Sequence, residues 1–137
     1  MIETAKRRGL GFLFVPDAPS IRPPRKRGNA SSETWTRELS QYECARRQWE
    51  FRRVSWFDAR AKRTHDLLGM FDALAFAPRA LGQRTVGLQY TSRENLNARV
   101  AKLRAHEDWP LVLLCGWRVL CWGWRKDGRL VEVEVEA

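Results

Sequence analysis

The chain contains two short apolar runs, at residues 70–76 and 86–92, and both carry polar residues where a buried strand would normally exclude them. The segment between the runs, residues 77–84, holds a proline and a glycine and predicts a hairpin loop. We therefore expect two neighbouring strands, the second over residues 85–91. This pair restricts the possible folds more than any other part of the sequence.

The polar residues in these runs predict a site. Side chains alternate between the two faces of a strand, so Gln89 and Thr91 point away from Leu88 and Tyr90. Asp72, in the first run, can then lie beside Gln89, and a carboxylate and an amide oxygen there could hold a hard cation such as Mg²⁺. The alternative is a structural Asp72 that caps a turn or pairs with an arginine. A carboxylate within an apolar run is seldom tolerated without a partner, which favours the functional reading.

The segment before these runs predicts one helix and one strand. A helix over roughly residues 33–46 is expected, capped by Ser31 or Ser32, with a core-facing stripe of Trp35, Leu39 and Tyr42. A strand is expected over residues 48–57, and its alternation slips at Arg52–Arg53, which indicates a bulge. Residues 58–65 form a polar, basic connector, and Gly69 suits a tight turn.

The segment after them predicts a helix and further strands. Leu96, Val100 and Leu103 share one face of a helix expected over residues 93–105, with Ser92 as its cap. The apolar run 111–117 is typical of a strand covered on both faces. The remaining expected elements are a strand at 118–124, a hairpin turn at 126–129 and a closing strand at 130–136 whose valines face inward and whose glutamates face water.

The order of these elements predicts an α/β (α+β) domain with a central mixed sheet flanked by helices. A length of 137 residues indicates a single core. We expect residues 1–30, rich in proline and basic side chains, to be a flexible arm, and residues 31–137 to form the domain. The arm is either a solvated tail or a set of phosphate contacts at Arg22, Arg25, Lys26 and Arg27.

The charge balance favours an anionic partner. Lysine and arginine total 25 against 16 acidic residues, a net charge of +9, which points to nucleic acid first and anionic membrane second. No apolar run approaches the roughly 20 residues of a membrane span. Three cysteines without metal-ligand spacing indicate reduced thiols and a cytoplasmic protein, and two histidines make a zinc site an unfavoured reading.

Three motifs in order carry a resemblance to a known family. They are DLLGMFDALA at residues 66–75, GLQYTS at 87–92 and NLNARVAKL at 95–103, followed by WGWRK at 122–126. In this order and spacing the chain resembles small phage-type, Holliday-junction-resolvase-like proteins of the PD-(D/E)XK nuclease superfamily. The resemblance covers roughly residues 31–136 and implies a restriction-endonuclease-like core.

The resemblance also implies roles for individual residues. Asp72 takes the place of the first motif acid, and Gln89-Tyr90-Thr91 takes the place of the (D/E)-x-K motif. Glu38 would be the glutamate of the first helix, although its place on the edge of the helix stripe also suits a solvated rim residue. Apart from the resemblance, Asp66, six residues before Asp72, is either a strand-entry or turn residue or a further metal ligand. In such nucleases the acids bind Mg²⁺ or Mn²⁺, which polarises the phosphate and activates water.

The second motif departs from the superfamily pattern in two ways. Gln89 contributes no charge, and Thr91 stands where the lysine would be. Arg99 or Lys102 on the following helix could supply a displaced cation. Together with Arg93, these two residues could otherwise contact phosphate or lie in solvent.

Three functions follow from these patterns. The first is a metal-dependent DNA endonuclease acting on branched or recombination intermediates, for which a homodimer would suit a two-strand cut. The second is a catalytically inactive nucleic-acid-binding protein on the same fold. The third is a phage accessory or inhibitor protein whose basic surface meets an acidic protein. The missing lysine favours the second and third functions, and the pairing of Asp72 with Gln89 favours the first.

Overall fold

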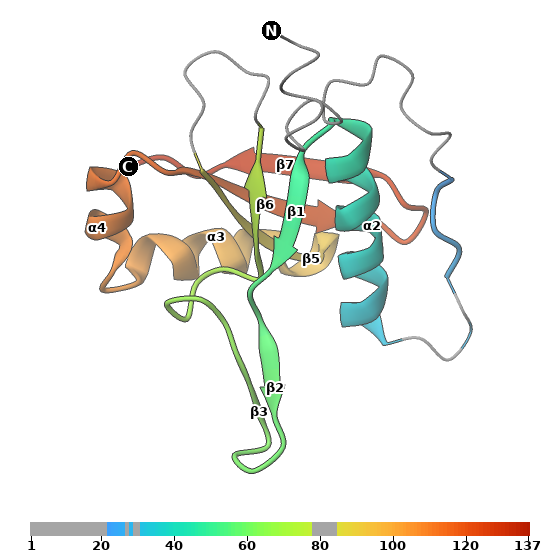
Figure 1. The fold of residues 1–137 in the computed structure, drawn as a ribbon, viewed down its shortest axis with the longest axis horizontal. Helices are drawn as coiled ribbons and strands as arrows, with labels where there is room; N and C mark the ends of the chain where they lie inside the picture. The colour runs from blue at the N-terminus through green and yellow to red at the C-terminus, as the bar shows by residue number, and fades with distance from the viewer. Residues whose placement is uncertain (1–21, 27, 29–30, 78–84) are drawn as a thin grey trace, which may run out of the picture.

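A computed structural model describes residues 22–26, 28, 31–77 and 85–137 and has an α+β architecture (Figure 1). A five-stranded mixed sheet has the order β1-β4-β5-β6-β7, and β2 and β3 form a separate two-stranded sheet. Three helices pack against the larger sheet. The elements are α2 (Ser32–Arg46), β1 (Glu50–Arg53), β2 (Trp56–Asp58), β3 (Arg63–His65), β4 (Ala73–Phe76), β5 (Val86–Ser92), the 3-10 turn η2 (Arg93–Asn95), α3 (Leu96–Ala105), α4 (Trp109–Leu114), β6 (Arg118–Trp124) and β7 (Leu130–Glu134).

One pair of neighbouring strands in the larger sheet is parallel, and the other pairs are antiparallel. Strands β1, β4 and β5 are antiparallel neighbours, β6 runs parallel to β5, and β7 is antiparallel to β6. The parallel pair needs a long crossover connection, which η2, α3 and α4 supply. Because β5 and β6 are covered on both faces, almost every residue in them is buried.

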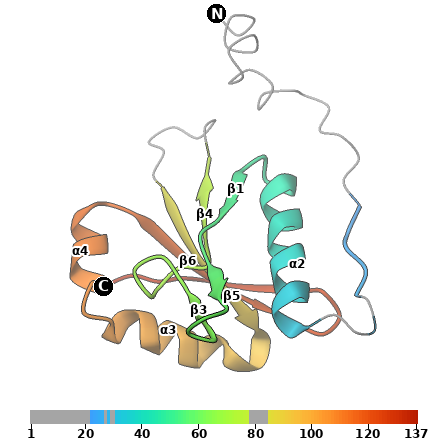
Figure 2. The same ribbon diagram turned by 60° about the horizontal axis from the view of Figure 1, so that its bottom comes forward.

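The hydrophobic core is divided by the sheet into two parts. Leu88, Tyr90 and Trp122 belong to the part beneath α2, together with Leu39 of that helix. The other part lies beneath α3 and α4 and contains Leu96 with other apolar residues of these helices. Figures 1 and 2 show α2 on one side of the sheet and α3 with α4 on the other.

Several predicted elements are confirmed. Helix α2 is capped by Ser31, whose side-chain oxygen accepts a hydrogen bond from the Thr34 N–H at 3.1 Å. Strands β4 and β5 are antiparallel neighbours, although the loop expected between them lies, except for Ala77, outside the described residues. The buried residues of α3 are Leu96, Val100 and Leu103, as its apolar spacing predicts.

The strand predicted at 111–117 is wrong, because these residues largely form helix α4. Pro110 lies in the first turn of α4, where its missing N–H costs nothing. A short apolar run has no period that separates a strand from a helix. The exposed side chains of Leu111 and Leu114 show that α4 is covered on one side only.

The single strand predicted at 48–57 is also wrong. Pairing with β4 ends at Arg53, and the chain leaves the sheet at Val54 and Ser55. It then forms β2, which pairs with β3, so the expected basic connector 58–65 is part of a hairpin. The slip at Arg52–Arg53 thus precedes the end of a strand and does not mark a bulge.

The glutamates of β7 are exposed and its valines face the core, as expected, and both glutamates also pair with arginines. Glu132 accepts a hydrogen bond from the indole N–H of Trp122 at 2.9 Å and pairs with Arg47 at 2.7 Å. Glu134 pairs with Arg118 at 2.9 Å. This side of β7 therefore continues the surface beneath α2.

Three sequence-based expectations concern membrane spans, cysteines and the N-terminal arm. In the described part of the chain, no helix has the length and apolar character needed to cross a membrane. All three cysteines are free, with Cys44 and Cys121 buried and Cys115 exposed. Most of the predicted arm, including Arg27, lies outside the described residues.

Candidate active site

Asp72 is fixed by both its backbone and its side chain at the point where β4 begins. Its N–H donates to the carbonyl of Leu88 and its carbonyl accepts from Val54, each at 2.9 Å. Its Oδ2 accepts hydrogen bonds from Gln89 Nε2 at 2.8 Å and from the Tyr90 N–H at 3.1 Å. The predicted adjacency of Asp72 and Gln89 is therefore confirmed.

Burial dominates the electrostatics of Asp72. Removal from water raises the pKa of its carboxyl group from 3.8 to about 7, against the hydrogen bond from Tyr90, which lowers it. The neighbouring carboxylates of Asp66 and Glu33 raise this pKa further, and the charge of Arg99 lowers it. Near neutral pH this carboxyl group is therefore divided between its protonated and ionised forms.

A hollow of about 330 Å³ opens beside Asp72. Its walls come from the start of α2, the base of the β2–β3 hairpin, the end of β5 and the start of α3. The polar residues that line it include Glu33, Thr64, Asp66, Asp72, Thr91 and Arg99. We call this hollow the cleft. The chain thus brings three carboxylates and one guanidinium to a single surface depression.

Asp66 contributes an oxygen without a partner. Its Oδ1 is buried and accepts no hydrogen bond. Burial raises the pKa of this carboxyl group, and the charges of Arg99 and Lys102 act in the opposite direction. A buried carboxylate oxygen with no donor is costly, and a bound cation would satisfy it.

Gln89 plays a different part from the one expected. Its NH₂ group, and not its oxygen, faces the carboxylate of Asp72. Its side chain borders a smaller neighbouring hollow that Asp66 and Arg99 also line. Gln89 therefore joins β5 to Asp72 as a hydrogen-bond donor, whereas Thr91 lines the cleft directly.

The glutamate of the first helix that reaches the cleft is Glu33. Glu38, the residue predicted from the sequence, lines a separate hollow with Arg22, Arg25 and Lys26. Five residues along a helix correspond to a rotation of about 140° from the starting direction, so the two glutamates face different ways. The signal that could have identified Glu33 is its place in the first turn of α2, two residues after the Ser31 cap.

The predicted nucleic-acid contacts fall into two groups. Arg99 lines the cleft and Lys102 borders the neighbouring hollow, while Arg93 lies in the 3-10 turn that precedes α3. The exposed Arg22, Arg25 and Lys26 lie with Glu38, outside the cleft. The structure thus places a basic residue of α3 in the cleft and the described part of the arm elsewhere.

The cleft satisfies part of what a divalent cation requires. Hard cations bind carboxylate oxygens, and Asp66, Asp72 and Glu33 supply these. The unpartnered Oδ1 of Asp66 and the raised pKa of Asp72 indicate that negative charge here lacks compensation. In the described ranges, however, no three histidine, cysteine or acidic side chains are close enough to ligate one ion together. A cation would therefore draw water or substrate oxygens into its coordination shell.

Comparison with known proteins gives no assignment. No protein-family profile, no curated protein and no solved structure matches this chain.

Proposed function

We propose that this chain is a metal-dependent nuclease that hydrolyses phosphodiester bonds in DNA, on a restriction-endonuclease-like core. One observation carries the proposal: the half-buried Asp72, hydrogen-bonded to Gln89 and Tyr90 of β5, shares a cleft with Glu33, Asp66 and Arg99. The order of α2, three antiparallel strands, α3 and a parallel strand is compatible with that core. The net charge of +9 supports a polyanionic substrate.

The residues of the cleft have distinct roles in this proposal. Asp72 and Asp66 would hold Mg²⁺ or Mn²⁺ directly, and Glu33 contributes charge from the start of α2. The bound ion polarises the scissile phosphate and lowers the pKa of the attacking water. Arg99 offsets charge that builds on the phosphate, a role that Thr91 cannot fill. Gln89 positions the Asp72 carboxylate.

A specific observation also favours a second function, nucleic-acid binding without cleavage. Thr91 lines the cleft at the position where the resemblance implies a lysine. Without that cation, transition-state charge has less compensation, whereas phosphate binding by Arg99 and Lys102 is unaffected. An accessory protein that binds an acidic protein partner remains the third alternative, and DNA binding that does not weaken with salt would favour it.

A cleavage assay on linear, nicked and four-way DNA in Mg²⁺ and in Mn²⁺ tests the first proposal. We expect activity in Mn²⁺ first, because Mn²⁺ stands above most hard ions in divalent affinity for a weak ligand set. Asp72→Asn should abolish cleavage and leave DNA binding intact. Cleavage by the wild type no faster than by Asp72→Asn, in both metals and on every DNA, would leave the binding function in its place.

The two helix glutamates provide a matched pair. Glu33→Gln should reduce cleavage strongly, and Glu38→Gln, on the same helix but outside the cleft, should not. Thr91→Lys should raise the rate where the cleft has room for the longer side chain. An equal effect of the two glutamine variants would remove Glu33 from the proposed site.

A further inference from the structure

The β2–β3 hairpin projects from the body of the protein. Figure 1 shows that this hairpin extends beyond the larger sheet on the side where β4 begins. Its strands pair only with each other, with Trp56 opposite His65 and Phe57 opposite Thr64. Both aromatic residues of β2 are exposed, Trp56 by 57% and Phe57 by 62%. An isolated two-stranded ribbon is only marginally stable, and large aromatic side chains exposed on it are typical of a binding surface.

Trp56 makes contacts within the hairpin itself. Its ring stacks on His65 with centroids 4.5 Å apart, and His65 Nε2 lies 3.3 Å from Asp58 Oδ2. These contacts hold the two strands together on one face of the ribbon. Within the described ranges no ring stacks on Phe57, which lies on the other face.

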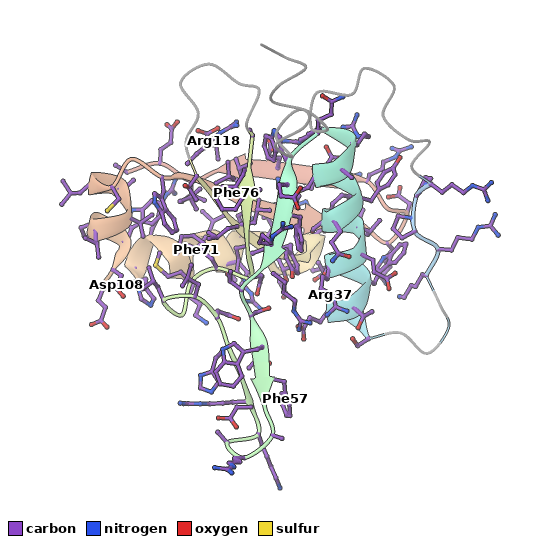
Figure 3. All side chains as sticks on the ribbon, viewed as in Figure 1. Arg37, Phe57, Phe71, Phe76, Asp108 and Arg118 are labelled. Carbon is purple, nitrogen blue, oxygen red and sulfur yellow. The ribbon has the colours of Figure 1, made fainter. Side chains whose placement is uncertain are left out.

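The face that carries Phe57 is the face toward the cleft. Residues directly opposite each other in an antiparallel pair share a face, so Phe57 and Thr64 point to the same side. Thr64 lines the cleft. Figure 3 shows Phe57 on the side of the hairpin that faces α2, where Arg37 also lies. A strand of nucleic acid that entered the cleft along the hairpin would therefore meet the Phe57 ring.

The tip of the β2–β3 hairpin carries positive charge. Arg60, Lys62 and Arg63 are all exposed. The acidic residue of the hairpin, Asp58, is occupied, because its Oδ1 accepts from the N–H groups of Arg60 and Ala61 and its Oδ2 contacts His65. An exposed aromatic ring beside basic side chains complements a nucleic acid, in which bases stack and phosphates carry charge.

From this juxtaposition we propose that the β2–β3 hairpin is a wedge that recognises unpaired bases in DNA. Phe57 stacks on a base that is free of its duplex partner, and Arg60, Lys62 and Arg63 bind the flanking phosphates. The inference rests on the proposed DNA-cleaving function and adds to it a recognition element: an unpaired base beside a duplex, read by Phe57. A perfectly paired duplex offers Phe57 no free base face.

Binding in the absence of metal tests the wedge without requiring cleavage. The full-length Asp72→Asn protein is titrated, in EDTA, into two labelled duplexes of equal length, one fully paired and one with a short central bubble carrying 2-aminopurine. We expect tighter binding to the bubble and a change in 2-aminopurine fluorescence. Phe57→Ala should reduce the bubble-to-duplex preference about tenfold, the range measured for loss of one stacked base.

Three further variants of the same protein separate stacking from charge. Phe57→Trp keeps a ring and should keep the preference, and Leu114→Ala, a matched exposed apolar residue on α4, should change nothing. The double variant Arg60→Ala with Arg63→Ala should weaken binding to both DNAs alike. It should reduce the slope of log affinity against log salt concentration by about 2.

The outcomes distinguish the wedge from the nuclease. An unchanged preference in Phe57→Ala, or no preference in the starting protein, overturns the wedge, even where the wild type cleaves DNA. A Phe57-dependent preference without cleavage in either metal supports the wedge and overturns only the nuclease. If the hairpin variants leave all DNA binding unchanged, the wedge is overturned, and a protein partner becomes the explanation for the exposed aromatic side chains.

Discussion

The charge state of Asp72 is the residue-scale feature with the widest consequence. Its pKa is raised to about 7, so between about pH 4 and pH 7 the folded protein holds a proton that the unfolded chain has released. Without a cation, the free energy of unfolding should therefore fall across this window as pH rises, by a few kcal/mol at most. Asp72→Asn has no titrating group at this position. It should therefore reduce the fall in the free energy of unfolding with pH, which thermal unfolding at a series of pH values measures.

Two comparisons complete this prediction. Asp127→Asn, at the exposed turn between β6 and β7, should keep the wild-type pH dependence. Mn²⁺ should raise the melting temperature of the wild type at pH 8 more than that of Asp72→Asn, because a bound cation favours the ionised carboxylate. The same pH dependence in wild type and Asp72→Asn would show that burial of this carboxyl group is not what destabilises the fold.

Leu68 shows a second local conflict, between residue type and backbone. Leu68 and Gly69 have φ values of +57° and +68°, and the Met70 N–H donates to the carbonyl of Leu67 at 2.9 Å. Positive φ at both central positions is typical of a type I′ turn, which strongly favours Asn-Gly. Since Leu68 is exposed by 42%, Leu68→Asn should raise the free energy of unfolding by about 0.5–1 kcal/mol. Leu68→Ala, which keeps the unfavourable φ, should gain little, and an equal gain from both in denaturant titrations would refute this explanation.

At the scale of elements, a buried polar chain fixes α2 on the sheet. The indole N–H of Trp124 donates to Ser40 Oγ at 2.9 Å, and the Ser40 hydroxyl donates to the carbonyl of Thr36 at 2.7 Å. Ser40→Ala would leave the buried indole N–H without an acceptor, which should lower the free energy of unfolding by about 1–3 kcal/mol. Gln41→Ala, exposed on the same helix, is the matched control in chemical denaturation. A Ser40→Ala protein as stable as the control would contradict this account.

Close packing fixes α3 in a similar way. A Cβ placed on Gly123 of β6 would lie 3.0 Å from the Cβ and Cδ2 of Leu96 and 3.3 Å from the Cα of Arg93. Gly123→Ala should therefore push the start of α3 from the sheet and destabilise the fold by about 1–3 kcal/mol. Gly116→Ala has open space but φ of +72°, so its cost should come from the backbone alone. Thermal unfolding with α3 probed by hydrogen exchange should show local loss of protection only in Gly123→Ala.

These elements also show why the sequence predicts some features and not others. Helices α2 and α3 and the β4–β5 pair were predictable, from the serine cap of α2, the apolar face of α3 and the proline- and glycine-containing loop between two short apolar runs. The adjacency of Asp72 and Gln89 follows from this pairing and from the alternation of side chains along a strand. Helix α4 was mistaken for a strand because its short apolar run has no distinguishing period. The β2–β3 hairpin was missed because its strands are polar or exposed, so no apolar face marks them.

The choice between Glu33 and Glu38 shows the limit for the site. Of the core-facing stripe predicted for α2, Trp35, Leu39 and Tyr42, only Leu39 is buried. The buried face of α2 is completed by Thr36, Ser40, Glu43 and Cys44. The rotation of the helix on the sheet decides which glutamate meets the cleft. That rotation depends on buried hydroxyl contacts between distant elements, which spacing within one helix does not report.

At the scale of the whole molecule, positive charge is concentrated near the beginning of the chain. Residues 1–28 contain seven basic and two acidic residues, so their deletion lowers the net charge from +9 to +4. We expect this deletion to weaken DNA binding and flatten its dependence on salt, because fewer counterions are released. Fluorescence anisotropy over a series of salt concentrations measures both effects. Equal affinity and slope in the truncated protein would place the DNA contacts entirely within the remaining domain.

The way the β2–β3 hairpin joins the larger sheet affects how this protein can change over evolutionary time. The hairpin leaves after β1 and returns before β4, and these two strands are neighbours. Residues can therefore be gained or lost in pairs along the hairpin without altering the register of the sheet. A single insertion within β5 would instead turn Gln89 and Thr91 to the opposite face and separate them from Asp72. The length of the hairpin can thus vary among descendants of this chain while the arrangement of Asp72, Gln89 and Thr91 stays constant.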